Sequence, residues 1–160
     1  MMRFIARLFA RAEPTLSEAG PADASALAAL HALSFRRGWS EDEVERLLLD
    51  RQVIAHRAMT ANELAGFILS RMAAGEAEIL SVAVAPRWRG RGLAGRLLAL
   101  HLRRLAGLAV STVFLEVEEA NKPALRLYAR SGFRQVGRRP GYYQRETGGP
   151  LAALVLRRDL

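Results

Sequence analysis

The feature that most constrains this chain is a glycine-rich loop between an apolar strand pattern and an apolar helix pattern. Residues 87–96 read RWRGRGLAGR and combine four arginines with the glycines Gly90, Gly92 and Gly95. Glycines let successive backbone N–H groups converge on an anion, and the start of a helix adds the positive end of its dipole. The loop is therefore predicted to bind a phosphate-bearing ligand, and a pyrophosphate suits it best.

Two other phosphate-binding patterns fit this loop less well. Its glycines match G-x-G-x-x-G, the pattern of dinucleotide-binding domains. In those domains the loop leaves a parallel strand almost at once, whereas here five residues, 85–89, separate the strand from the first glycine, and three antiparallel strand patterns come before it. No Gly-Lys-Ser/Thr closes the run, which excludes a Walker loop.

Hydrophobic periodicity predicts an α/β fold. Ser40 and Glu43 form a capping-box pattern at the start of the second helix. The first three long strands follow one another through short turns, which indicates an antiparallel meander. The expected elements are a short strand near 15–19, helices at 22–33 and 41–50, strands at 53–59, 63–72 and 76–84, a helix at 91–107, a strand at 111–119, a helix at 122–131 capped by Asn121, a strand at 133–139, a loop at 141–150 and a strand at 151–158.

Length and composition indicate one domain. A chain of 160 residues with 51% hydrophobic content can bury a single core without cross-links. We expect residues 14–160 to form that domain. Residues 1–13 carry arginines between apolar residues at helical spacing, which predicts a basic amphipathic extension, either packed on the domain or mobile, in preference to a membrane anchor or a targeting peptide.

The chain has no cysteine, which excludes disulfides, thiolate metal sites and a cysteine nucleophile and fits a reducing, cytoplasmic compartment. Its histidines, His31, His56 and His101, stand at no metal-ligand spacing, so we expect structural or surface histidines and no metal cofactor. The net charge of +8 suits anionic partners, yet it comes almost wholly from arginine, a bias that genome composition also produces. Nucleic-acid binding is not required to explain it.

Two motifs together resemble the GCN5-related N-acetyltransferase (GNAT) superfamily. Residues 89–94, RGRGLA, match its R/Q-x-x-G-x-G/A signature directly after the strand pattern LSVAVAP. Residues 121–133, NKPALRLYARSGF, resemble its N-x-x-A-x-x-L-Y-x-x-x-G-F segment. The resemblance covers roughly residues 14–160. It implies a mixed, mostly antiparallel sheet that is splayed at the coenzyme site, with helices on both faces, and acetyl-coenzyme A as the co-substrate.

The resemblance also implies which residues hold the coenzyme. The backbone of residues 82–84 is expected to pair with the pantetheine amides like an added strand. The glycine loop would hold the pyrophosphate, and Asn121 would contact the pantetheine arm while capping its helix. The complete expected set is Val82, Ala83, Val84, Arg89, Gly90, Arg91, Gly92, Leu93, Ala94, Gly95 and Asn121.

Within that superfamily the chain is most similar to the RimI type, which acetylates the N-terminal alanine of a ribosomal protein. The similar segments are LHALSF followed by WS, LEVEEAN and GYY. Glu118 and Ala120 stand where an arginine and a serine are common in that type, and Pro150 stands where an acidic residue is frequent. These departures leave the peptide substrate open.

Acetyl transfer requires a neutral amine, a polarised thioester carbonyl and a proton for the leaving thiolate. An α-amine, with a reference pKa of about 7.7 to 8.0, demands less of a base than a lysine at about 10.4. By the RimI resemblance, Glu116 is the expected general base and Tyr128 the expected proton donor, although a lone tyrosine on a helix is more often a packed aromatic. Glu118 shares the side of Glu116 by strand parity, as a helper or an acidic rim, and Glu119 is expected at the surface.

Three aromatic residues remain for the acceptor side: Trp39, Tyr142 and Tyr143. Core packing is the alternative for Trp39. The adjacent tyrosines cannot both face one core, so at least one is expected to be exposed, where a contact with the acceptor peptide is a reasonable use for it. The sequence thus predicts an enzyme that acetylates a protein N-terminus, with a ribosomal protein beginning with alanine as the favoured substrate. The alternatives are acetylation of lysine or a small amine, and a non-catalytic acetyl-coenzyme A-binding module.

Overall fold

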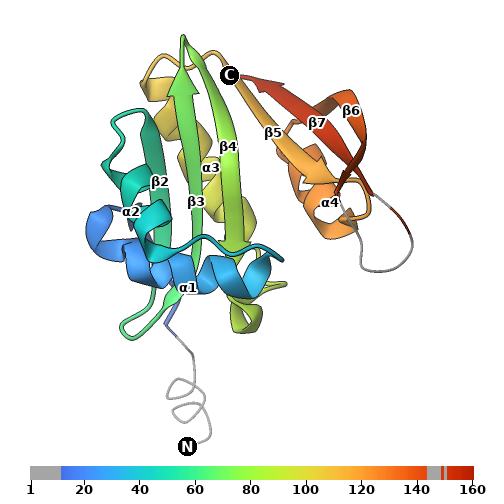
Figure 1. Cartoon of the computed structure of the whole chain (residues 1–160). Coiled ribbons are helices and arrows are strands. Elements are labelled where there is room, and N and C mark those ends of the chain that lie inside the picture. The colour runs from blue at the N-terminus through green and yellow to red at the C-terminus, as the bar shows by residue number, and fades with distance from the viewer. Residues whose placement is uncertain (1–11, 144–148, 150) are drawn as a thin grey trace, which may run out of the picture.

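The computed structural model describes residues 12–143, 149 and 151–160 and forms a single sheet flanked by helices (Figure 1). Most of the predicted extension at 1–13 therefore lies outside the described residues. No helix within the described part is long and apolar enough to cross a membrane. The strands are β1 Thr15–Glu18, β2 Val53–Met59, β3 Leu64–Ala73, β4 Glu76–Val84, β5 Thr112–Glu118, β6 Arg134–Tyr143 and β7 Leu151–Asp159, and the helices are α1 Ala24–Ser34, α2 Glu41–Leu49, α3 Leu93–Gly107 and α4 Lys122–Arg130, with 3-10 turns η1 Pro21–Asp23 and η2 Pro86–Trp88.

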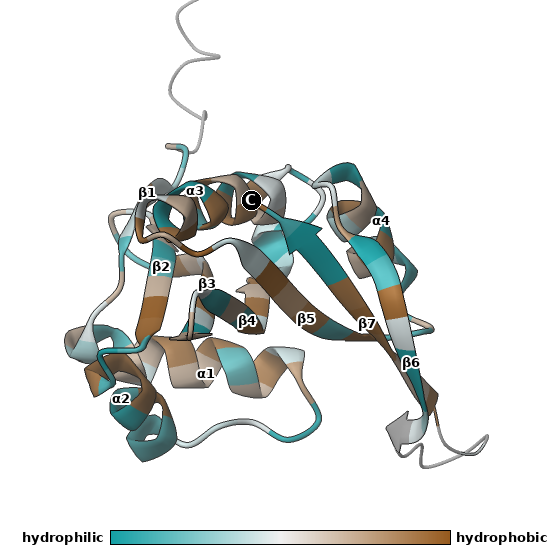
Figure 2. Ribbon diagram, turned by 90° about the horizontal axis from the view of Figure 1, so that it is seen from above, coloured by the Kyte–Doolittle hydropathy of each residue, from teal (hydrophilic) through white to brown (hydrophobic). Residues whose placement is uncertain are grey.

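The seven strands lie in the order β1-β2-β3-β4-β5-β7-β6. Every neighbouring pair is antiparallel except β4 with β5, which is parallel. Helices α1 and α2 cover one face of the sheet, and α3 and α4 cover the other (Figure 2). The predicted mixed, mostly antiparallel sheet with helices on both faces is thereby confirmed.

Each face of the sheet has its own apolar core. The central strand β3 serves both cores, because successive side chains of a strand point to opposite faces. Ile68 packs in the core beneath α3 and α4, while Phe67 and Leu69 pack in the core beneath α1 and α2. All three side chains are at most 1% exposed. Because both faces of β3 are buried, its sequence is a continuous apolar run.

The local signals for helix starts agree with the structure. Glu43 N donates to Ser40 Oγ at 3.2 Å, and Ser40 N donates to the Glu43 carboxylate at 2.7 Å, which completes the predicted capping box. Asn121 Oδ1 likewise accepts from the backbone N–H of Ala124 at 3.3 Å. Helix α3 begins at Leu93, two residues later than predicted.

The predicted loop at 141–150 is partly wrong. Strand β6 continues through Tyr143, which pairs with Leu151 of β7 after a register shift beyond Arg139. Pro140 stands within this strand. It is tolerated because β6 forms the edge of the sheet, where a missing N–H removes no ladder hydrogen bond on the open side.

Strands β4 and β5 pair over only part of their length. Their register runs from Glu76 opposite Thr112 to Ile79 opposite Leu115 and ends there. On the other side of β4 the register with β3 shifts at the same level, so that Leu80 is an extra residue. A bulge of this kind bends a strand and increases its twist. Beyond it, the two parallel strands diverge (Figure 1).

A buried polar chain joins the sheet to α3. His56 Nδ1 lies 2.8 Å from His101 Nδ1, and His101 Nε2 lies 2.7 Å from Ser70 Oγ. All three residues are buried. Burial lowers the pKa of His56, and it lowers the pKa of His101 to about 3, with a smaller contribution from His56. Both histidines are therefore neutral structural groups at pH 7.

The pKa of His101 gives the folded protein an acid-labile element. Because the folded pKa is about 3, below the unfolded value of about 6.5, its contribution to stability is complete above pH 6.5 and is lost as the pH falls. At pH 5 the loss from this group is about 2 kcal/mol. We expect His101→Gln, which keeps hydrogen-bonding groups without titrating, to lose less free energy of unfolding than the wild type between pH 7 and pH 5. Urea unfolding measures it, and equal losses in the two proteins contradict the role of His101.

Candidate functional site

The glycine loop has the backbone geometry of an anion site. Gly90 and Gly92 have φ of +72° and +78°, values that glycine adopts without strain. A Cβ at either position would meet no atom within 4 Å, so the loop backbone is open to an approaching group. The first hydrogen bond of α3 joins Arg96 N to Gly92 O at 3.1 Å. The N–H groups of residues 93–95 precede it and lie at the positive end of the helix.

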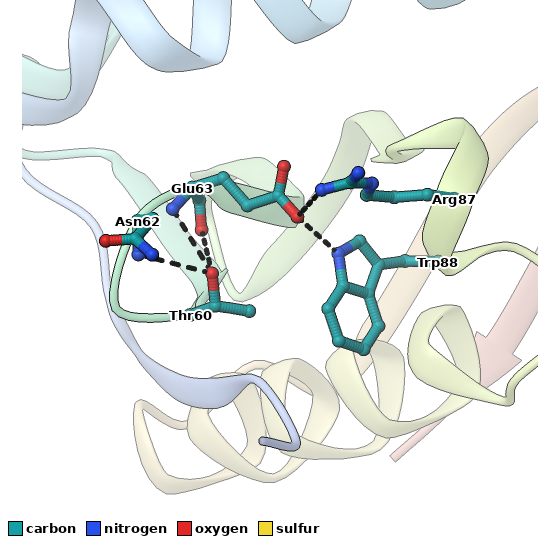
Figure 3. Close-up of polar contacts among 5 residues, drawn as sticks. All are labelled: Thr60, Asn62, Glu63, Arg87 and Trp88. Carbon is teal, nitrogen blue, oxygen red and sulfur yellow. Dashed lines mark hydrogen bonds and ion pairs between the residues drawn. The ribbon is translucent and has the colours of Figure 1, made fainter. Parts of the chain in front are cut away.

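A carboxylate on the β2–β3 turn anchors the entry to this loop (Figure 3). Glu63 Oε1 accepts hydrogen bonds from Trp88 Nε1 and from Arg87 Nη1, each at 3.0 Å. Trp88 is buried, at 4% exposed. The turn itself is closed by Thr60, whose Oγ1 accepts from the backbone N–H groups of Asn62 and Glu63. The start of the glycine loop is thus tied to a segment about 25 residues earlier in the chain.

The arginines of the loop are engaged with the protein itself. Arg89 Nε donates to the carbonyl of Val84 at 2.9 Å. The Arg91 guanidinium lies over the Trp88 ring, 5.2 Å from its centroid. Arg96 pairs with Glu13 at 3.2 Å. These contacts hold the guanidinium groups against the protein, and the backbone N–H groups at the start of α3 add to the positive character of the loop.

Two cavities meet where β4 and β5 diverge. The first, of about 620 Å³, lies against the glycine loop, and the second, of about 700 Å³, lies on the α1 side of the sheet. Both are lined by Val82, Ala124 and Tyr128. The first cavity brings together nine of the predicted coenzyme residues: Val82, Ala83, Val84, Arg89, Gly90, Gly92, Leu93, Ala94 and Gly95. Asn121 lines the second cavity, and Arg91 lines neither.

Glu116 and Glu118 both line the second cavity. Val113, Leu115 and Val117 point into the core on the α3 side, so the alternation of β5 directs the two glutamates to the opposite face. The Glu116 carboxylate lies 3.0 Å from Arg139 Nη1 on β6, and its side chain is 20% exposed. Arg139 reaches it across β7, a contact that sequence reasoning did not predict.

Tyr128 lies at the junction of the cavities. Its side chain is buried, and its ring meets Phe133 edge-on with centroids 5.6 Å apart. Burial raises the pKa of Tyr128 to about 12. The hydroxyl is therefore protonated at neutral pH and can donate a proton or a hydrogen bond.

The structure gives a mixed result for the predicted acceptor residues. Trp39 is not among the residues that line either cavity. Its ring stacks on His31 at 4.0 Å and its backbone N–H donates to His31 Nδ1 at 3.1 Å, so it packs beneath a residue that does line the second cavity. Tyr142 and Tyr143 belong to β6 by their backbone, but their side chains lie outside the described part of the chain.

Several cavity residues escaped sequence reasoning. The end of α1 and the segment after it supply His31, Ser34, Phe35, Arg36 and Arg37, and the bulged part of β4 supplies Leu80 and Ser81. The only sequence signal for the first group is the LHALSF segment. The second group has none, because a bulge depends on the partner strand.

Comparison with known proteins places this site in a family. The model of the acetyltransferase (GNAT) family matches residues 24–133. The chain is 34% identical over 95 residues to the ribosomal protein bS18-alanine N-acetyltransferase of Haemophilus influenzae, covering 59% of this chain and 64% of that enzyme. It is 42% identical over 83 residues to the mycothiol acetyltransferase of Mycobacteroides abscessus, covering 50% of this chain and 28% of that one. The matches thus span less than two thirds of these relatives.

Solved structures show the same fold. The ribosomal-protein-S18-alanine N-acetyltransferase of Escherichia coli superposes with a TM-score of 0.84 at 25% identity, covering 91% of this chain and 93% of that one. Arabidopsis thaliana NAA60 in complex with acetyl-CoA superposes with a TM-score of 0.81 at 21% identity, covering 92% and 98%. With the family match over more than half of its length, the chain belongs to the acetyltransferase (GNAT) family.

Proposed function

We propose that this protein transfers the acetyl group of acetyl-coenzyme A to the N-terminal α-amine of a protein that begins with a small residue, with a ribosomal protein beginning with alanine as the favoured substrate. The observation that carries the proposal is the meeting of two cavities at Tyr128, with the glycine loop in one and Glu116 in the other. The similarity to ribosomal-protein alanine N-acetyltransferases supports the choice of acceptor.

The residues of the first cavity fit the coenzyme. The open backbone at Gly90 and Gly92 suits a pyrophosphate, since no side chain intrudes there. Beyond Ile79, the edge of β4 no longer pairs with β5. Apart from the Val84 carbonyl, which accepts from Arg89 Nε, the backbone groups on this edge of residues 82–84 can therefore hydrogen-bond an extended amide chain such as pantetheine, in the manner of an added strand.

The acceptor would enter from the α1 side, because that is where Glu116 faces. The amine nitrogen bonds to the thioester carbon as the carbon–sulfur bond breaks. The Glu116 carboxylate takes one proton from nitrogen, and the Tyr128 hydroxyl gives one proton to sulfur. Arg139 holds the carboxylate at 3.0 Å and so fixes its orientation in the cavity.

A small primary amine is the second candidate acceptor. The similarity to mycothiol acetyltransferases favours it, although those matches cover a small part of the relatives. A peptide and a small amine differ in how much of the second cavity they fill. The cavity of about 700 Å³, which extends to the end of α1, favours the peptide.

The test of the acceptor compares three substrates at pH 7.5. They are a peptide beginning with alanine, an N-blocked peptide with one lysine, and a small primary amine. An α-amine is neutral roughly two hundredfold more often than a lysine at this pH, so we expect the alanine peptide to be acetylated at least tenfold faster than either rival. Mass spectrometry locates the acetyl group, and a faster reaction of the lysine or the small amine refutes the α-amine assignment.

The coenzyme assignment predicts a specific effect of Gly92→Ala. The new Cβ projects from the loop backbone toward the open side, where it would meet the pyrophosphate. We expect the affinity for acetyl-coenzyme A to fall at least tenfold by calorimetry. Gly75→Ala is the matched control, because Gly75 has a similar φ of +79° and equally open surroundings but lies on the β3–β4 turn. Equal affinities of the two folded variants contradict the assignment.

The catalytic roles predict different pH profiles. Glu116→Gln should lower kcat/KM by about a hundredfold or more, most strongly at low pH where the amine is protonated. Glu118→Gln, on the same face, should lower kcat/KM much less.

Tyr128→Phe should lower kcat while the affinity for acetyl-coenzyme A stays the same. With a Tyr128 pKa of about 12, the proton donor stays protonated, so the wild-type rate should not fall between pH 8 and pH 10. Full turnover in both Glu116→Gln and Tyr128→Phe removes these residues from the mechanism.

A further inference from the structure

One buried hydroxyl stands out in the second cavity. Within the described residues, Ser81 Oγ is the only buried side-chain oxygen or nitrogen that has no hydrogen-bond partner in the protein. Ser81 is 5% exposed. A buried polar group without a partner lowers stability and is uncommon in native proteins. The fold therefore leaves the hydrogen-bonding capacity of this hydroxyl unused.

The position of Ser81 suggests a use for this hydroxyl. The last pair between β4 and β5 is Ile79 with Leu115. Glu116 follows directly on β5, and Ser81 follows on β4 after the bulged residue Leu80. Val82 packs with the core on the α3 side and Leu80 with the core on the α1 side. Ser81 and Glu116 line the same cavity, from opposite sides of the gap between the strands.

Three other polar side chains that line this cavity are already engaged. Ser34 Oγ donates to the Leu30 carbonyl at 2.9 Å. His31 accepts from the backbone of Trp39, and Glu116 pairs with Arg139. Ser81 differs from these three because it lines the same cavity and its buried Oγ has no partner in the protein.

We propose that Ser81 Oγ accepts a hydrogen bond from the reacting amine and restricts the enzyme to primary amines. The inference rests on the proposed α-amine acetylation. A neutral primary amine has two hydrogens and one lone pair. As the C–N bond forms and the C–S bond breaks, one hydrogen passes to Glu116 as a proton and the other remains in the amide product. Ser81 binds the hydrogen that remains, which directs the lone pair at the thioester carbon.

A secondary amine cannot make both contacts. When neutral it has one hydrogen, and that hydrogen is needed by Glu116. An N-terminal proline or an N-methylated residue therefore loses the contact with Ser81. The proposed substrate class is a chain that begins with an unmodified small residue other than proline.

The experiment measures kcat/KM for two peptides that differ only in N-methylation of the first alanine. We expect Ser81→Ala to lower kcat/KM for the alanine peptide about tenfold and to leave kcat/KM for the N-methyl peptide unchanged. The preference for the alanine peptide over the N-methyl peptide should therefore fall by the same factor. The affinity for acetyl-coenzyme A should not change. Ser34→Ala, which removes a hydroxyl of the same cavity that already bonds to the backbone, should keep the wild-type preference.

Stability separates this role from a structural one. Because Ser81 Oγ has no partner in the protein, Ser81→Ala should keep or raise the melting temperature, whereas a serine required for folding would lower it. A lower melting temperature, weaker coenzyme binding, or a preference that narrows because the N-methyl peptide reacts faster each overturn the proposal. If the wild type acetylates no N-terminus, the proposed function fails and this inference fails with it. If the wild type does and Ser81→Ala matches it, only the role of Ser81 is lost.

Discussion

The end of the pairing between β4 and β5 is the constraint on which the rest of the site depends. Hydrogen bonds join these parallel strands only as far as Ile79 and Leu115. The bulge in β4 at the same level turns the strand away. One consequence is that β5 leaves the edge of β4 unpaired at residues 82–84, where the Val84 carbonyl accepts from Arg89. Another is that two cavities share Val82, Ala124 and Tyr128 at this point. Under the proposed function, the coenzyme occupies one of them and the acceptor the other.

Charge is distributed differently from what the composition suggests. The chain carries a net charge of +8, yet the arginines of the glycine loop contact a carbonyl, an indole ring and a carboxylate of the protein. Backbone N–H groups at the start of α3 add to the positive character of the loop. In the second cavity, Glu116 and Arg139 form an ion pair. The buried histidines remain neutral, because burial lowers the pKa of each of them.

Patterns among residues close in sequence predicted most of the fold. Contacts between distant segments could not be predicted from such patterns. The strands at 53–59 and 76–84 agree with the structure to the residue, and both helix caps follow from side chains close in sequence. The extension of β6 to Tyr143 depends on pairing with β7, which no local pattern shows. The contact of Glu63 with Trp88 and that of Glu116 with Arg139 join distant segments. Ser81 was missed for the same reason, since its lack of a partner is a property of the packed protein.

The central claim is that acetyl donor and amine acceptor meet between the diverging ends of β4 and β5. The most direct test is a crystal structure with coenzyme A joined covalently, through an acetyl linker, to the nitrogen of an alanine peptide. The account predicts the pyrophosphate on the glycine loop, the pantetheine along residues 82–84, and the alanine nitrogen between Glu116 and Ser81 with the peptide leading toward the end of α1. A peptide that leaves by any route other than the cavity on the α1 side contradicts it.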